Sequence, residues 1–337
     1  MDNLYIPTSN YKVFVRCDTY NQSNYIEDTL FGFALQKTSF PFVCMVMDDH
    51  STDGTQDVMK LWATKYCAIN NAVYKEDQYS KIIIAKHKTN TNCMFAFYFL
   101  KQNLYKRQNI KNKIYDVWRK KCEYEALCEG DDYWTEEHKL QEQVRILNED
   151  KTVMLVHTGF MTVDSNGKEY YRKSYCNFQK ISKKEKGLLS LFDRNHIMTL
   201  SIMFRVELLE SELFKACPFL YDYTYFFSAA FLGQIRFIPT IMGAYRMNPD
   251  SLMNSKKDKV NADIFEIYKY FTIEFYKRTF SRLSLSDNIY IRCKILANIM
   301  ARGDRQFCNQ IIHIDSMTRV LFPIMTAYEY IKHKMTV

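Results

Sequence analysis

The sequence predicts an α/β protein with a mixed, mostly parallel sheet flanked by helices and a C-terminal α-helical extension. Short, continuously apolar segments alternate with stretches of helical periodicity in the first half of the chain, as in parallel β/α folds. Acidic, turn-forming residues follow two of these apolar segments, at the strand ends where open α/β sheets bind ligands. The 337 residues, 47% of them hydrophobic, are enough for one large domain, 1–255, and the helical extension, 256–337.

The beginning of the sheet is predicted from four consecutive elements. Lys12–Cys17 alternates as a strand does, and Tyr25–Gln36 has apolar residues at helical spacing with Asn24 as its N-cap. Phe42–Met47 is short and continuously apolar, which is typical of a buried strand, and Thr55–Tyr66 is the next helix. Strand, helix, strand, helix is the beginning of a right-handed parallel arrangement.

The remaining elements follow the same logic. A hairpin is expected at Asp164–Gly167, whose residues suit a turn with positive φ. Apolar or periodic segments predict a strand at Lys81–Ala85, a mostly helical stretch at Lys101–Lys121, a central strand at Tyr124–Cys128, a helix at Thr135–Leu147 and a strand at Met154–Val163. In the extension, helices are predicted at Val260–Phe280, Asp287–Arg302 and Met317–Met335.

Two acidic clusters stand at predicted strand ends. Asp48 and Asp49 follow the second strand, and Glu129, Asp131 and Asp132 surround Gly130 after the central strand. A hard cation such as Mg²⁺ or Mn²⁺, shared with substrate phosphates, is one way to neutralise adjacent carboxylates. The alternative is an acidic turn that caps the following helix.

Composition excludes several classes of protein. No glycine-rich dinucleotide or P-loop motif is present, and the ten cysteines lack zinc-binding spacing, so they are expected to be small buried residues of a reducing compartment. No apolar run reaches about 18 residues, and the N-terminal residues do not resemble a signal peptide, so a cytoplasmic protein is expected. Motifs for nucleic-acid binding are absent.

Basic residues are concentrated in one stretch. The net charge is +8, and Lys101–Lys121 carries eight Lys or Arg residues against the single acidic residue Asp116. This stretch is either a solvated helix face or a surface for phosphates or anionic membranes. The basic, amphipathic end of the chain is expected to pack against the first domain, with peripheral contact at the inner face of a membrane as the alternative.

Three motifs in order resemble a known family. They are Thr19-Tyr20-Asn21, Asp48-Asp49-x-Ser51-Thr52-Asp53-Gly54-Thr55, and Glu129-Gly130-Asp131-Asp132-Tyr133-Trp134 with Lys139-Leu140-x-x-Gln143. Together they resemble the inverting glycosyltransferases of family 2, which have the GT-A fold, over about residues 11–254. Thr199-Leu200-Ser201, Tyr221-Asp222-Tyr223 and Ala244-Tyr245-Arg246 follow in the order expected of that family.

The resemblance implies a role for each matching residue. Asp222 would be the catalytic base, and Asp132 would bind Mn²⁺ or Mg²⁺. Asp49 would contact the base of the nucleotide with support from Asp48, and Ser201 would border the donor sugar. The implied nucleotide- and donor-binding residues are Thr19, Tyr20, Asn21, Asp48, Asp49, Lys81, Asp131 and Ser201.

The implied function is metal-dependent hexosyl transfer from a nucleotide-diphosphate-sugar, with UDP favoured, to a glycan or glycolipid acceptor, including a lipid-linked glycan, in surface polysaccharide biosynthesis. Asp18, Asp77, Glu125 and Asn248 depart from the family pattern. The departures at Asp18, Asp77 and Asn248 leave a catalytically silent sugar-nucleotide-binding or scaffold protein as an alternative. A nucleotidyltransferase is less well supported, because Asp18–Asn21 lacks a glycine-rich loop.

Overall fold

A computed structural model describes residues 4–171, 188, 191–192, 197–247, 257–278, 284–301 and 304–314. The strands are β1 Val13–Thr19, β2 Phe42–Asp48, β3 Val73–Glu76, β4 Ser80–Lys86, β5 Cys93–Leu100, β6 Tyr124–Leu127, β7 Tyr133–Trp134, β8 Val153–Val163, β9 Glu169–Tyr171, β10 Ile202–Arg205 and β11 Gln234–Arg246. The α-helices are α1 Ile26–Ala34, α2 Thr55–Tyr66, α3 Gln108–Arg119, α4 Lys139–Glu149, α6 Glu212–Lys215, α7 Asp222–Leu232, α9 Lys257–Lys277, α10 Leu285–Ala301 and α11 Arg305–Ile314. Three 3₁₀ turns are η1 Ile69–Asn71, η3 Thr199–Ser201 and η4 Val206–Glu210.

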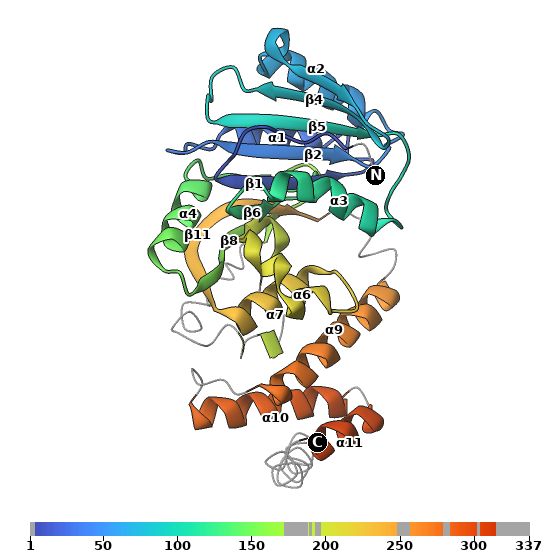
Figure 1. The fold of residues 1–337 in the computed structure, drawn as a ribbon, viewed down its shortest axis with the longest axis vertical. Helices are drawn as coiled ribbons and strands as arrows, with labels where there is room; N and C mark the ends of the chain where they lie inside the picture. The colour runs from blue at the N-terminus through green and yellow to red at the C-terminus, as the bar shows by residue number, and fades with distance from the viewer. Residues whose placement is uncertain are drawn as a thin grey trace.

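The described strands form one sheet in the order β3-β4-β5-β2-β1-β6-β10-β8-β11-β7, with β9 paired to β8 (Figure 1). Its centre is parallel, because β5, β2, β1 and β6 run in the same direction. Antiparallel pairs extend the sheet toward both edges. The predicted mixed α/β class is therefore confirmed, and the carboxyl ends of four neighbouring strands meet at one edge.

The alternation of β1 explains why helices cover both faces of the sheet. Val13, Val15 and Cys17 point into a core that they share with residues of α1, α2 and α4. Phe14 points into the opposite core, which contains residues of α3. Arg16 and Asp18 lie on the same face of the strand as Phe14, so β1 carries two charged side chains toward α3.

The predicted elements match closely in the parallel half, with three differences. Helix α1 begins at Ile26 with Tyr25 at its N-cap position and no side-chain cap, so the predicted Asn24 cap is wrong. Helix α4 begins at Lys139 rather than Thr135, because the Thr135 backbone N–H donates to the Met242 carbonyl and so continues the pairing of Tyr133–Trp134 with β11. Strand β5 was not predicted, although its sequence, CMFAFYFL, has the continuous apolar pattern of a buried strand.

The C-terminal helices share a hydrophobic core with α7. Ile267 and Phe271 of α9 and Ile295 of α10 are buried in the same cluster as Phe226 and Phe227 of α7. In Figure 1 these helices lie at the end of the long axis opposite α2. The predicted division at 255/256 falls outside the described residues, as does the predicted helix Met317–Met335, and the division stays a prediction.

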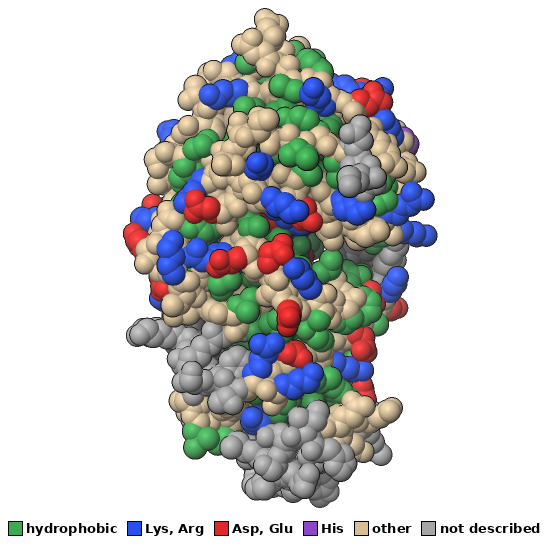
Figure 2. Space-filling view, in the orientation of Figure 1, with side chains coloured by type: hydrophobic (Ala, Val, Ile, Leu, Met, Phe, Trp, Pro, Cys, Tyr) green, Lys and Arg blue, Asp and Glu red, His purple; other side chains and the backbone are tan. Residues whose placement is uncertain are grey.

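Within the described part of the chain, no helix is long and apolar enough to cross a membrane. The basic stretch Lys101–Lys121 is not a uniformly solvated face, because Lys111 and Arg119 are buried in ion pairs. On the face of the molecule in Figure 2, Lys and Arg side chains are scattered among Asp and Glu side chains rather than gathered in one patch.

Candidate active site

Two loops at the carboxyl ends of β1 and β2 are joined by hydrogen bonds. The Asn21 backbone N–H donates to Ser51 Oγ at 2.9 Å, and Asn21 Oδ1 accepts from the Thr52 backbone N–H at 2.9 Å. Asn21 has a φ of 54°, in the left-handed region that asparagine tolerates better than most residues. The Asp49 backbone N–H also donates to the Thr19 carbonyl at 2.9 Å. The predicted residues Thr19, Asn21 and Asp49 therefore lie together, and Tyr20 beside them is exposed.

Asp48 and Asp49 point to opposite faces of the sheet. Asp48 Oδ2 accepts from the Ser51 backbone N–H at 3.0 Å and from Gln56 Nε2 at 2.6 Å, whereas its buried Oδ1 has no partner. Asp49 Oδ1 accepts from the Leu104 backbone N–H at 2.5 Å, and its Oδ2 lies 3.6 Å from Lys111 Nζ. Both carboxylates are thus held by the protein, at the carboxyl end of β2.

The loop 101–107, which follows β5, is a part of this region that sequence reasoning missed. Asn103 Nδ2 donates to the Asp49 carbonyl at 2.9 Å, and the Leu104 contact fixes the Asp49 carboxylate. This loop lies here because β5 is parallel to β2 and ends at the same edge. If CMFAFYFL had been recognised as a strand, the sequence would have predicted that loop 101–107 lies at this edge of the sheet.

Lys81 lies at the same edge but farther from the loops. It pairs in register with Phe99 of β5, which in turn pairs with Asp48, so one strand separates Lys81 from Asp48. Lys81 lines a pocket of about 330 Å³ with Lys60, Lys75 and Tyr74. Asp77 of the same stretch is buried and accepts from the Tyr79 and Ser80 backbone N–H groups, so it closes the β3–β4 turn.

The acidic turn after β6 is held by hydrogen bonds to α1 and to β1. Thr29 of α1, which is fully buried, donates to the carbonyls of Gly130 at 3.0 Å and Asp132 at 2.6 Å. The Gly130 backbone N–H donates to the Asp18 carbonyl at 2.9 Å, and a Cβ on Gly130 would lie only 2.6 Å from Thr19 Cβ. Glycine is therefore required here by close packing against Thr19.

Arg246, at the end of β11, fixes the two aspartates of this turn. Its backbone N–H donates to Asp132 Oδ1 at 2.8 Å, and its Nε donates to the Asp131 carbonyl at 2.9 Å. Its Nη2 forms an ion pair with Asp28 of α1 at 2.7 Å. The Tyr-Arg segment thus locks β11, α1 and the acidic turn together.

Electrostatic interactions place Asp222 in the same cluster as the acidic turn. Burial and the nearby Asp222 raise the pKa of Glu129 to about 8. Burial, Asp131 and Glu129 raise the pKa of Asp132 well above its usual range. Burial and the charges of Asp132, Asp131, Glu129 and Asp222 raise the pKa of Tyr245 to about 12. The charges of four carboxyl groups therefore act on Tyr245.

Asp222 is the first residue of α7 and is accessible to solvent. Thr199 Oγ1 donates to its Oδ2 at 2.7 Å. Surrounding protein raises the pKa of Asp222, although the Thr199 hydrogen bond and the Arg16 charge act in the opposite direction. The predicted donor-side residue Ser201 is buried, and its hydroxyl donates to the Met198 carbonyl at 2.7 Å.

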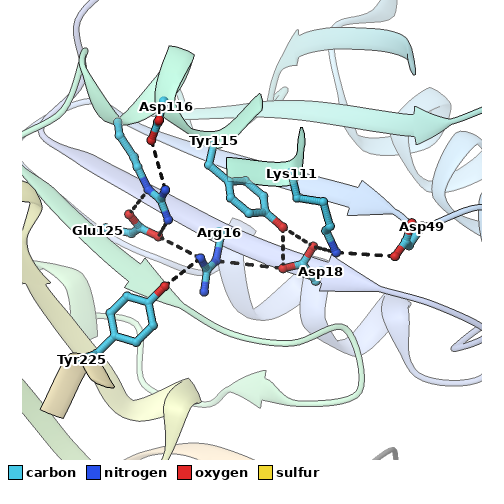
Figure 3. A network of polar contacts seen from close by, with 9 residues as sticks. Arg16, Asp18, Asp49, Lys111, Tyr115, Asp116, Glu125 and Tyr225 are labelled. Atoms are coloured by element: carbon cyan, nitrogen blue, oxygen red, sulfur yellow. Dashed lines mark hydrogen bonds and ion pairs between the residues drawn. The ribbon is translucent and has the colours of Figure 1, made fainter. Parts of the chain in front are cut away.

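A chain of alternating charges runs beneath these loops on the α3 side of the sheet (Figure 3). Lys111 Nζ lies 2.9 Å from Asp18 and 3.6 Å from Asp49. Arg16 lies 4.0 Å from Asp18 and 3.6 Å from Glu125, and its Nη1 donates to the Tyr225 hydroxyl at 3.2 Å. Two departures from the family pattern, Asp18 and Glu125, are thus partners in one network, which sequence reasoning did not connect.

The acidic turn offers oxygen ligands of the kind that Mg²⁺ and Mn²⁺ prefer. Burial and the neighbouring carboxylates raise the pKa values of Glu129 and Asp132, and a bound cation would favour the ionised form of both groups. Among the described residues, no group of three or more His, Cys, Asp or Glu side chains is arranged to hold a metal ion by itself. The residues fit a metal that takes further ligands from substrate. Asn248 lies outside the described residues.

Comparison with known proteins gives similar sequences but no family model that matches the chain. Uncharacterized protein Rv1520 of Mycobacterium tuberculosis (strain ATCC 25618 / H37Rv) is 26% identical over 239 residues, which cover 70% of this chain and 59% of that protein. Uncharacterized protein Mb1547 of Mycobacterium bovis (strain ATCC BAA-935 / AF2122/97) gives the same values. The chain therefore matches about three fifths of the length of these curated relatives.

Solved structures with a similar fold include TarS of S. aureus. TarS 1-349 in complex with UDP-GlcNAc matches with a TM-score of 0.56 and 17% identity, covering 92% of this chain and 83% of that chain. TarS 1-349 in complex with UDP matches with a TM-score of 0.50 and 15% identity, covering 85% and 70%. At such low identity the likeness concerns the fold, and the chain has the mixed α/β fold of GT-A type that the sequence predicts.

Proposed function

We propose that the protein is an inverting glycosyltransferase that moves a sugar from a nucleotide-diphosphate-sugar, with UDP favoured, to a hydroxyl of a glycan or glycolipid. The observation that carries this proposal is the grouping of Asp222 with Glu129, Asp131 and Asp132, whose charges all act on Tyr245. The grouping lies beyond the carboxyl ends of parallel strands, where ligands bind in such sheets. A shared fold with TarS, solved with UDP and UDP-GlcNAc, supports the choice of donor.

In this mechanism Asp222 takes the proton of the acceptor hydroxyl as that oxygen attacks the anomeric carbon. The raised pKa of Asp222 makes its carboxylate a stronger base than an aspartate with the ordinary pKa. Thr199 holds Oδ2, so Oδ1 is the oxygen that receives the proton. One in-line displacement through an oxocarbenium-like state inverts the configuration. Asp132 would hold Mn²⁺ or Mg²⁺, which when bound offsets negative charge on the departing diphosphate.

The first test is the substitution Asp222→Asn. We expect donor binding to stay near the wild-type value while turnover falls by about 10²-fold or more, because a general base is lost. Release of the nucleoside diphosphate and product formation measure turnover, after UDP-, GDP- and dTDP-sugars have been screened by thermal shift with Mn²⁺. Asp57→Asn is the matched control, because Asp57 is 85% exposed on α2 and only pairs with Lys60. Near-normal transfer by Asp222→Asn would remove Asp222 from the mechanism.

The second test addresses the metal through Asp132→Asn. Asparagine keeps an oxygen that can accept from the Arg246 backbone N–H, so the turn keeps that hydrogen bond while the negative charge is removed. We expect the Mn²⁺-dependent part of donor affinity to disappear in calorimetric titrations. Equal responses to Mn²⁺ in the wild-type protein and the variant would exclude Asp132 as the ligand.

A sugar-nucleotide-binding protein without transfer activity is the second candidate. It is favoured by Asp49, whose carboxylate is occupied by Leu104 and Lys111 rather than directed to open space. A protein of this kind would bind a sugar nucleotide in the thermal-shift screen but release no nucleoside diphosphate from it. The same two measurements therefore separate the candidates.

A further inference from the structure

Helix α7 begins with the candidate base but has no local cap. Asp222 is its first residue, Tyr221 stands at the N-cap position, and no side chain caps the first turn. Uncapped backbone N–H groups make a helix end prone to fraying. A catalytic carboxylate needs a fixed direction relative to its substrate. The first turn of α7 must therefore be ordered by contacts from other parts of the chain.

Two tyrosines of this turn supply such contacts on either side of Asp222. The Tyr221 hydroxyl donates to Asp263 Oδ2 of α9 at 2.9 Å. The Tyr225 hydroxyl accepts from Arg16 Nη1 of β1 at 3.2 Å (Figure 3). Both hydrogen bonds join a neutral phenol to a charged group, which makes them stronger than hydrogen bonds between neutral groups.

The two anchoring residues are themselves held. The Arg16 side chain is 14% exposed and lies 3.6 Å from Glu125, which Arg119 binds through two nitrogens at 2.6 and 3.1 Å. Asp263 belongs to α9, whose Phe271 stacks on Phe227 of α7 at 4.9 Å between ring centroids. The sheet thus holds one side of the turn, and the C-terminal helices hold the other.

We propose that Tyr221 and Tyr225, anchored by Asp263 and Arg16, clamp the first turn of α7 and are positioning residues for Asp222. This inference rests on the proposed function. It assigns a role in catalysis to the C-terminal helices, which orient the base through Asp263 without contacting substrate.

The test compares three variants that each remove a single tyrosine hydroxyl. Tyr221→Phe and Tyr225→Phe each remove one contact of the clamp. Tyr124→Phe is the control, because its hydroxyl donates to Asn148 Oδ1 at 2.7 Å in another part of the sheet. We expect kcat for nucleoside diphosphate release from the sugar nucleotide selected in the screen to fall about fivefold in each clamp variant, as for one lost hydrogen bond. The KM for the donor should not change, and Tyr124→Phe should keep both values.

A second measurement does not depend on activity. Hydrogen exchange followed by mass spectrometry should show faster exchange of peptides covering residues 222–226 in both clamp variants, but not in Tyr124→Phe. In addition, Asp263→Ala combined with Tyr221→Phe should be no worse than either alone, since both remove the same contact.

The outcomes separate the two hypotheses. Unchanged exchange in residues 222–226, or a kcat loss no larger than that of Tyr124→Phe, would overturn the clamp. A wild-type protein that releases no nucleoside diphosphate from any sugar nucleotide would refute the proposed function, while the exchange data would still decide whether the turn is clamped.

Discussion

Glu125 is fully buried on β6, where the pattern of a central strand calls for an apolar residue. Its carboxylate is bound by Arg119 of α3 and approached by Arg16 of β1. A buried charge of this kind persists only when it is paired. The pairing depends on how α3 packs across β1 and β6, so the sequence indicated an anomaly at Glu125 but could not indicate its partners.

Removal of the Glu125 carboxylate should strongly destabilise the fold. In Glu125→Ala, Arg119 loses its main partner and stays buried, so we expect the free energy of unfolding to fall by about 3–5 kcal/mol. Urea denaturation measures the change. Glu123→Ala is the control, because Glu123 is 60% exposed and its ion pair with Lys12 is on the surface, where the loss should stay below about 1 kcal/mol. Similar losses in the two variants would show that the buried network adds little.

Lys139 was named in the sequence only as part of a motif, and the structure shows which contacts it makes. The Lys-Leu-x-x-Gln pattern accompanied the acidic motif, but Lys139 is buried, donates to Gln143 Oε1 at 2.8 Å and lies 4.3 Å from the centroid of the Trp134 ring. Gln143 Nε2 in turn donates to the carbonyls of Val156 and Ser201. The Lys-Leu-x-x-Gln pattern therefore contributes buried hydrogen bonds beneath the candidate site.

Burial lowers the pKa of Lys139 from 10.5 to about 7. The unfolded chain binds this proton more tightly than the folded protein between these values, so the contribution of Lys139 to stability rises as pH increases from about 7 to 10.5. Below pH 7 Lys139 destabilises the folded state. We expect the free energy of unfolding of Lys139→Met to exceed that of the wild-type protein by the largest amount at pH 6, and by a smaller amount at pH 10. Urea unfolding at both pH values measures it, and a difference independent of pH would contradict the lowered pKa.

At the scale of elements, the parallel half was predictable because its strands are continuously apolar and its acidic turns stand directly after them. The antiparallel additions were harder. β3 is exposed along its whole length, and β7 is only two residues long, so neither has a hydrophobic pattern of its own. The hairpin after β8 was predictable from its turn, where Gly167 has a φ of 79°.

Gly130, in the acidic turn after β6, packs closely against Thr19 of the predicted nucleotide-binding loop. We expect Gly130→Ala to lower UDP affinity at least tenfold, because the new Cβ would displace Thr19 and Gln22, which lie 2.6 Å from it. Gly54→Ala is an informative control. Gly54 has a φ of +94°, and nothing lies within 4 Å of a new Cβ. The substitution Gly54→Ala should therefore lower the free energy of unfolding by about 1–2 kcal/mol, because of the positive φ, and leave UDP binding unchanged. Calorimetric titration of both variants decides whether the close approach at Thr19 shapes the pocket.

At the scale of the whole molecule, the sequence predicted a helical extension that packs against the first domain. The structure places Ile267, Phe271 and Phe275 of α9 in one core with α7. The periodicity of α9 indicated an apolar face, but no local pattern states which surface that face covers. Whether the extension unfolds separately is therefore a question of coupling through the Phe227–Phe271 stack.

Phe271→Ala tests this coupling. Phe271 is fully buried, so we expect the substitution to lower the free energy of unfolding by about 3–5 kcal/mol. All three tryptophans, Trp62, Trp118 and Trp134, lie in the cores on either side of the sheet, whereas α9, α10 and α11 contribute much of the helical signal. If the molecule is one cooperative unit, tryptophan fluorescence and circular dichroism will shift together to lower urea in the variant. If only the helical signal shifts, the extension folds as a separate domain, and its influence on Asp222 must then operate through the Tyr221–Asp263 hydrogen bond rather than through a shared core.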